Sequence, residues 1–356
     1  MTSEEAMTSI ENKRSDLSSC SLCPRNCGVD RLAGKLGICG VDARIKIARA
    51  ALHMWEEPCI SGKNGSGAVF FSGCSMHCVY CQNRSIANGK GWEISGGRLA
   101  EIFLELQEQK ANNINLVTPT HYTPQIAAVI CLAKRQGLRI PVVYNCSGYE
   151  SAETLRMLDG LVDIYLTDFK YPDAEGAKRY SHAADYPKRA MEALAEMLRQ
   201  CPAPSFAYQE EKTLRKEEHL SMQDGSLEVV TEDASLDEDT GLDYGEVIES
   251  GCMKKGVIVR HLLLPGRVKQ ACQVVRQIYE RFGEQVYFSL MNQYTPFTYV
   301  EGQYPEIARK VTKREYERWI DYVLELGVEQ AFVQEGDTAE ESFIPEFEGK
   351  GVFSGE

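Results

Sequence analysis

The chain carries the sequence FFSGCSMHCVYCQN at residues 70–83, directly after the apolar, strand-like residues 68–69. Its three cysteines, Cys74, Cys78 and Cys81, follow a C-x3-C-x2-C spacing on one short loop. Three thiolates so close together suit an iron–sulfur cube, because soft sulfur ligands hold iron well. Such a cube usually takes four cysteines, so three leave one iron with an open position where a small molecule can coordinate.

Two other interpretations of these cysteines stay open, namely a zinc site and small buried hydrophobes. Structural zinc usually takes four ligands as two close pairs, which this spacing does not offer. The spacing, with the aromatic Tyr80 before the third cysteine, resembles the signature of the radical S-adenosylmethionine (SAM) superfamily. The resemblance implies a 4Fe-4S cluster and SAM as cofactors. It also implies that SAM, bound to the open iron, is cleaved to a 5′-deoxyadenosyl radical.

Length and composition bound the class of protein. The 356 residues, 43% of them hydrophobic, suffice for one large domain or two. The sequence contains no run of about 18 apolar residues, so we predict no membrane-spanning helix. The polar, acidic N-terminus is unlike a signal peptide, so we expect a cytoplasmic protein. In a reducing compartment, thirteen cysteines favour metal or cluster ligation over disulfides.

The net charge of −13 is concentrated in one segment. Residues 209–250 hold 14 acids and 3 bases, a net of −11, which leaves about −2 for the rest. No basic face is offered to nucleic acid, so we expect no nucleic-acid partner. Dense like charge with few aromatic residues predicts a mobile insertion outside the catalytic barrel.

A second set of cysteines precedes the first. Cys20, Cys23 and Cys27 follow a C-x2-C-x3-C spacing, and Cys39 comes after eleven intervening residues. The glycines and the proline between them allow the tight turns of a metal-wrapping loop. We predict a metal site here and leave zinc and a second cluster open; incidental thiols are the alternative.

Beyond the first cysteine loop, strand-like and helical patterns alternate. Strands are predicted at 68–71, 114–118, 141–146, 163–170, 256–266, 286–291 and 331–333, and helices at 98–109, 123–137, 151–159, 173–200, 269–282 and 313–326. Thr123 is the expected cap of the second helix, with Pro124 at its first position. Strand–helix units repeated about six times predict an α/β fold with a parallel sheet. We expect an open partial (β/α)6 barrel, with the chemistry at the carboxyl ends of its strands.

The predicted organisation has five parts. They are a cysteine-rich metal-binding segment at 1–55, the first part of a radical SAM barrel at 56–204, the acidic insertion at 205–250, the last part of the barrel at 251–300, and a C-terminal helix and strand extension at 301–356.

Several longer motifs resemble the pyruvate formate-lyase activating enzyme-like family, in the variant with an N-terminal Cys-Pro-Arg segment. They are CPR at 23–25, EEPCISG at 56–62, FSGC at 71–74, TPTHY at 118–122 and RHLLLPG at 260–266. The match covers nearly everything except the insertion and the extreme ends. It implies an oxidoreductase that acts on a protein or peptide and takes electrons from a reduced flavodoxin- or ferredoxin-like donor.

The same resemblance implies roles for single residues. The three loop cysteines bind the cluster, and the backbone around Tyr80 lies near the adenine of SAM. Asp168 and Lys170 correspond to the SAM-contacting pair of the glycyl-radical activases, and an Asp-x-Lys spacing places both side chains on one face of a strand. Arg260 corresponds to an arginine that holds the carboxylate of SAM or substrate.

The chain departs from that family at two points. The family carries Gly-Gly-Glu after the second strand to receive the SAM amino group, where this chain has Thr118 and Thr120. Their hydroxyl or carbonyl oxygens are candidates for that contact. His121 is then either a proton donor or substrate contact, or a packed, hydrogen-bonded histidine. Gln293 stands near the position of a histidine in the activases, so the role of that histidine does not transfer directly.

Three further residues belong to the predicted site. Ser147 and Asn292, at strand ends, join the polar cofactor-binding rim. Cys59, just before the first strand, is a reactive catalytic thiol, an extra ligand or a buried core cysteine.

Three functions compete at this point. The first is an activase that abstracts hydrogen from a glycine in a partner protein. The second is a radical SAM enzyme that modifies a small molecule or a peptide. The third is a cluster-bearing redox or interaction protein without SAM chemistry. The polar crevice predicted around Asp168, Lys170 and Arg260 argues against the third, because an electron carrier has no need of it.

Overall fold

The computed structural model describes residues 15–207, 219–223, 226–230, 251–334 and 345–354. Its main sheet has ten strands: β1 (Lys46–His53), β2 (Ser66–Phe71), β3 (Trp92–Glu93), β4 (Ile114–Val117), β5 (Val142–Cys146), β6 (Ile164–Asp168), β7 (Ser205–Phe206), β10 (Met253–Leu262), β11 (Tyr287–Met291) and β12 (Ala331–Val333). The α-helices are α2 (Pro58–Ser61), α3 (Arg84–Ala87), α4 (Gly96–Glu108), α5 (Thr123–Arg135), α6 (Ala152–Leu155), α7 (Ala174–Ser181), α8 (Tyr186–Gln200), α9 (Val268–Phe282), α10 (Thr298–Glu301) and α11 (Lys313–Glu325). Short 3-10 turns are η1 (Ser15–Ser19), η2 (Thr120–Tyr122), η3 (Arg156–Leu158), η5 (Gly283–Gln285) and η6 (Pro305–Ile307).

Seven strands pair in parallel in the order in which the chain makes them. They run β2, β4, β5, β6, β10, β11 and β12, and every pairing among them is parallel. A sheet wound in one direction by right-handed crossovers curls into an open barrel rather than a flat sheet. The predicted α/β fold with a parallel sheet is confirmed.

Side chains alternate across each strand, so each strand serves the helices with one set and the interior with the other. Val142 and Tyr144 of β5 belong to the large core that the helices cover. Val143 belongs to a separate inner cluster with Leu166 and Ile258, to which residues of α2 also belong. Two residues farther along the same strands, the next inner positions lie nearer the carboxyl ends, and they carry Asn145, Asp168 and Arg260.

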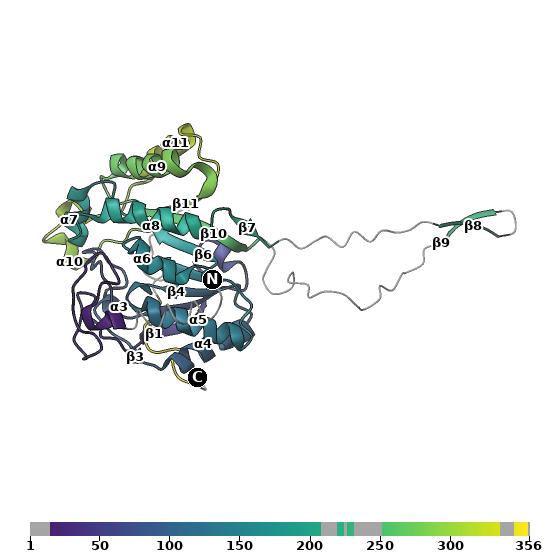
Figure 1. Ribbon diagram of the computed structural model, residues 1–356. Helices are drawn as coiled ribbons and strands as arrows, with labels where there is room; N and C mark the ends of the chain where they lie inside the picture. The colour runs from purple at the N-terminus through teal and green to yellow at the C-terminus, as the bar shows by residue number, and fades with distance from the viewer. Residues whose placement is uncertain (1–14, 208–218, 224–225, 231–250, 335–344, 355–356) are drawn as a thin grey trace.

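The helices cover the outer face of the sheet. In Figure 1, α4, α5, α6 and α8 lie in front of the strands, and α9 lies beside α11. Local capping explains several of their starts, because a side-chain oxygen satisfies a backbone N–H of the first turn. Ser95 accepts from Arg98 at α4, and Thr312 forms a capping box with Glu315 at α11.

Two local predictions differ from the structure. Helix α5 begins at Thr123 with Tyr122 at the N-cap, and the Thr123 hydroxyl instead bonds the Thr120 carbonyl and Tyr144. The single helical stretch predicted at 173–200 is two helices, because His182 adopts a left-handed conformation with φ of 51° and ends α7.

The start of the sheet was not predicted. Strand β1 pairs antiparallel with β2, and β3 pairs antiparallel with β1. The chain near residue 350 returns to β1, where Ala50 donates to the Lys350 carbonyl and Gly349 donates to Ala48. Gly351, at φ of 70°, lies so close to the Ala50 carbonyl that a Cβ there would be 2.0 Å from it. Glycine is therefore required at this contact.

Most of the acidic insertion lies outside the described residues, and so does the prediction that it is mobile. Within it the structure describes one antiparallel hairpin, β8 (His219–Gln223) with β9 (Ser226–Val230), which pairs with itself as a separate sheet. Among the described residues, no helix is long and apolar enough to cross a membrane.

Candidate functional site

A cavity of about 260 Å³ opens at the carboxyl ends of the parallel strands. The sulfur-bearing side chains of Cys74, Cys78 and Cys81 all line it. The other side of the cavity is made by the inner positions of three adjacent strands, which carry Asn145, Asp168 and Arg260. The loop cysteines and the predicted polar crevice therefore meet in one space.

Hydrogen bonds to sulfur hold two of the cysteines. The Met76 N–H donates to Cys74 Sγ over 3.4 Å, and the Ser181 hydroxyl donates to Cys78 Sγ over 3.0 Å. Burial raises the pKa of the Cys81 thiol to about 12, and neighbouring Cys74 and Cys78 add to the shift. Such thiols lose their protons readily only to a metal, because ligation stabilises the thiolate.

This donor set fits an iron–sulfur cluster. In a cube each cysteine binds a different iron, so the sulfurs need not converge on one point. The three soft donors that line the cavity would hold three irons of a 4Fe-4S cluster.

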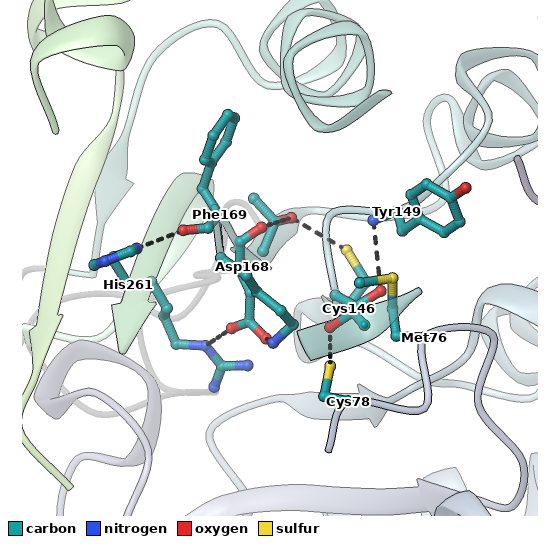
Figure 2. Close-up of polar contacts among 12 residues, drawn as sticks. Met76, Cys78, Cys146, Tyr149, Asp168, Phe169 and His261 are labelled. Atoms are coloured by element: carbon teal, nitrogen blue, oxygen red, sulfur yellow. Dashed lines mark hydrogen bonds and ion pairs between the residues drawn. The ribbon is translucent and has the colours of Figure 1, made fainter. Parts of the chain in front are cut away.

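The floor of the cavity is a buried network of charges. Arg260 donates from Nε to Asp168 Oδ1 over 3.0 Å, from Nη1 to Glu56 Oε2 over 3.2 Å, and from Nη2 to Asn145. Lys170 pairs with the other oxygen of Asp168. Arg260 faces Asp168 directly because the two residues are register partners of β10 and β6. Figure 2 shows Asp168 and Cys78 among the residues whose polar contacts are drawn around this site.

The network keeps Asp168 ionised. Burial alone would raise its pKa, but Lys170 and Arg260 outweigh burial and hold the pKa below its ordinary value. Lys170 is also close enough to Cys74 and Cys81 to oppose the rise in their pKa. A cation and an anion thus lie side by side next to the three sulfurs, an arrangement suited to a zwitterionic ligand.

Most of the predicted cofactor-binding residues line the cavity. Besides the three cysteines these are Tyr80, Thr118, Ser147, Asp168, Lys170, Arg260 and Gln293. Thr118 directly follows β4 with φ of 60°, a left-handed conformation that is strained for a β-branched residue. Tyr80 is held by a 2.8 Å hydrogen bond between its hydroxyl and that of Tyr171.

Four predicted residues lie elsewhere. His121 is buried behind the cysteine loop, where Nε2 is 2.7 Å from the Ser72 carbonyl and the ring packs on Tyr122. Burial lowers its pKa to about 3, so it is neutral and does not face the cavity. This placement favours the packed histidine over the proton donor.

The other three serve the surrounding structure. Thr120 donates to Glu150 over 2.8 Å within the core. Cys59 lies in the inner apolar cluster with Ile60 and Val143, where burial raises the pKa of its thiol, so it is a core cysteine. Asn292 is not among the residues that line the cavity.

Sequence reasoning missed several residues of the cavity, among them Glu56 and Trp55. Glu56 binds Arg260 and accepts from Asn115 and Asn145, yet it comes from the segment before the first parallel strand. Asparagines at inner positions of buried strands are the signal that could have revealed a polar floor. Trp55, beside Glu56, lines the cavity with 64% of its surface exposed.

The four N-terminal cysteines are close to one another. A Cβ placed on Gly37 would lie 3.3 Å from Cys39 Sγ and 3.5 Å from Cys27 Sγ. Burial raises the pKa of Cys23 to about 12, and the charges of Cys39, Cys20 and Cys27 add to this. No ion-binding arrangement is formed here among the described residues, so metal binding stays a prediction.

Comparison with known proteins gives a family match for part of the chain. The family model of the radical SAM superfamily matches residues 68–203. An uncharacterized protein, MJ0674 of Methanocaldococcus jannaschii, is 23% identical over 328 residues, which cover 88% of this chain and 76% of that protein.

A solved structure, Streptococcus suis SuiB bound to the precursor peptide SuiA, aligns with a TM-score of 0.42 and 12% identity. The alignment covers 74% of this chain and 46% of the SuiB chain, so this chain spans about half of that structure. At this level the likeness says nothing about a shared substrate. The match to the radical SAM superfamily covers residues 68–203, the part of the chain that contains the three cavity-lining cysteines.

Proposed function

We propose that this protein is a radical SAM enzyme with its cluster on Cys74, Cys78 and Cys81. The observation that carries the proposal is that these three side chains share one cavity with the Asp168–Lys170–Arg260 network, at the carboxyl ends of the parallel strands. When bound there, a 4Fe-4S cluster and SAM supply a 5′-deoxyadenosyl radical that abstracts hydrogen from the substrate.

The charged floor binds and orients SAM in this proposal. Lys170 would hold its carboxylate, Asp168 its amine or ribose, and the backbone around Tyr80 its adenine. Arg260 has a different role from the one first expected. Its three nitrogens already donate to Asp168, Glu56 and Asn145, so it holds Asp168 in place rather than binding a carboxylate itself. Thr118, Ser147 and Gln293 complete the polar lining.

The apolar part of the cavity protects the chemistry. Phe70, Val117, Leu262 and Met291 are among the residues that line it. These side chains exclude water around the ligand, which strengthens the charge interactions of the floor.

For the substrate we propose a peptide or protein-bound group, with a reduced flavodoxin- or ferredoxin-like protein as electron donor. The family motifs at 23–25 and 260–266 support this choice. A literal glycyl-radical activase is the narrower form of it, and a small-molecule substrate is the alternative. We also propose a metal at Cys20, Cys23, Cys27 and Cys39, either zinc or a second cluster, because their thiols lie close together.

The test is anaerobic reconstitution with iron and sulfide, followed by reduction in the presence of SAM. We expect a four-iron cluster by electron paramagnetic resonance and formation of 5′-deoxyadenosine by chromatography. Cys131→Ala is the matched control for alanine variants of Cys74, Cys78 and Cys81. Cys131 is a partly exposed thiol on α5 that does not line the cavity. Reconstituted protein that binds iron but leaves SAM intact would support the redox-protein alternative.

The substrate class needs a second experiment. Reduced enzyme and SAM are incubated with candidate glycyl-radical proteins, and a glycyl signal is sought by electron paramagnetic resonance. If none gains a radical, while a small metabolite is consumed in proportion to the 5′-deoxyadenosine formed, the small-molecule alternative replaces the peptide proposal.

A further inference from the structure

The stretch from Cys74 to Cys78 forms hydrogen bonds with the N-terminal segment, defined here as residues 20–40. The Cys74 N–H donates to the Cys39 carbonyl over 3.1 Å. His77 Nε2 lies 2.8 Å from the Ile38 carbonyl, and His77 itself has a left-handed φ of 48°.

Arg25 supplies the side-chain part of this contact. Its Nε donates to the Ser75 carbonyl over 2.9 Å, and its Nη2 reaches the Met76 carbonyl at 3.5 Å. The same guanidinium donates to the carbonyls of Ser181 and His182 at the end of α7. Charge-assisted bonds from one planar group to several carbonyls fix the group and its acceptors together.

The acceptors matter because they lie next to sulfur ligands. Ser75 and Met76 stand between Cys74 and Cys78, and Ser181 donates its hydroxyl to Cys78 Sγ. Arg25 therefore connects the loop backbone just before Cys78 with the end of α7, where Ser181 bonds the sulfur of Cys78. The guanidinium group of Arg25 also lies over the ring of Tyr149, with its carbon 5.3 Å from the ring centroid.

Close packing supports the same conclusion. Gly73, at φ of 93°, leaves no room for a side chain, since a Cβ there would lie 2.7 Å from the Cys39 carbonyl. Arg31, fully buried, donates to the His121 carbonyl over 2.6 Å, and His121 contacts the Ser72 carbonyl. The N-terminal segment thus touches residues on both sides of Cys74.

We propose that the N-terminal segment, chiefly through Arg25, holds the cysteine loop (residues 72–83) in its cluster-binding conformation. Arg25 is a positioning residue in this proposal, because it contacts the backbone between ligands and not the ligands themselves. The inference rests on the proposed function for the identity of the cluster. The conformational part concerns the protein alone and is measured without iron.

The experiment compares full-length Arg25→Ala and Arg25→Lys with the wild type and with Arg44→Ala. Arg44 is the matched control, because it is an arginine of the same region that binds Asp42 and Glu93 at the surface and does not reach the loop. Amide hydrogen exchange on the metal-free proteins reports peptides 72–82 and 20–40 separately. After reconstitution, the rate of iron release to a chelator is measured.

We expect Arg25→Ala to raise exchange in peptide 72–82 and to release iron about tenfold faster, with a broadened resonance signal of the reduced cluster. Arg25→Lys keeps the charge but cannot bridge several carbonyls, so it should restore only part of the protection. A role confined to folding of the N-terminal segment would change peptide 20–40 and leave peptide 72–82 as in the wild type, and that result overturns the proposal.

The outcomes separate the two proposals. If the wild type itself takes up no cluster, the proposed function fails, and hydrogen exchange still decides the role of Arg25. If the wild type takes up a cluster and Arg25→Ala matches it in exchange and iron release, the role of Arg25 fails alone. Should Arg25→Ala not fold, Arg25→Lys decides, and behaviour equal to that of the wild type overturns the inference.

Discussion

Two cysteine-rich loops lie against each other, and their spacings are mirror images. The N-terminal cysteines begin C-x2-C-x3-C and the second loop is C-x3-C-x2-C. Cys74, Cys78 and Cys81 line a cavity beside charged side chains, whereas none of the four N-terminal cysteines does. Spacing makes a loop able to bind metal, but its place at the strand ends gives it a substrate cavity.

The largest expected effect separates the two loops by activity. Replacing Cys74, Cys78 or Cys81 with alanine should reduce SAM cleavage to background, because each side chain is a proposed ligand. Cys27→Ala should keep cleavage measurable per bound cluster, since Cys27 does not reach the cavity. Formation of 5′-deoxyadenosine normalised to iron content is the measurement. Equal loss in Cys27→Ala would show that both loops serve one site.

The second effect tests the charged floor that distinguishes the cavity. Asp168→Asn leaves Lys170 and Arg260 without their shared carboxylate, so we expect kcat/KM for SAM to fall about a hundredfold. Asp159→Asn is the control, because Asp159 forms an exposed pair with Arg199 and such pairs contribute little. Similar kinetics for both variants would remove Asp168 from the proposed SAM contacts.

The third effect concerns metal in the N-terminal loop alone. A protein with Cys74, Cys78 and Cys81 all changed to alanine should still bind iron or zinc, and removing that metal should lower its melting temperature by several degrees. Elemental analysis and thermal unfolding measure both. Four native-state thiols that react fully with a thiol reagent before chelation would contradict the prediction.

The smallest effect is the pH dependence of stability caused by one buried carboxyl group, Glu150, which lies outside the cavity lining. Burial raises the pKa of Glu150 from 4.5 to about 7, a difference worth about 3 kcal/mol at most. Because the folded-state pKa is the higher one, this stability is fully present below pH 4.5 and is lost as pH rises to about 7.

Glu150→Gln should therefore remove the loss of stability between pH 5 and pH 7 that the wild type shows, as followed by urea unfolding. Glu153→Gln, on the nearby helix α6, is the comparison variant. An unchanged pH slope in Glu150→Gln would show that another group titrates.

Sequence patterns foretold the features that depend on local repetition. The parallel strands followed from alternating apolar segments. Asp168 and Arg260 were identified through the resemblance to the activases, and the parallel sheet makes them register partners of β6 and β10. The predictions that failed concern contacts that depend on tertiary structure. After β4 the chain turns into η2, which carries His121 and Thr120 away from the cavity. Glu56 enters from a distant segment that no periodic pattern marks.

The return of the chain to β1 has a consequence for synthesis on the ribosome. Strand β1 is synthesised early, yet Ala50 donates to the carbonyl of Lys350 and Ala48 accepts from the N–H of Gly349. Until those residues emerge, part of this edge has unpaired backbone groups that can pair with another strand. The order in which the chain is made therefore leaves an early segment dependent on a late one, and slow translation lengthens that exposure.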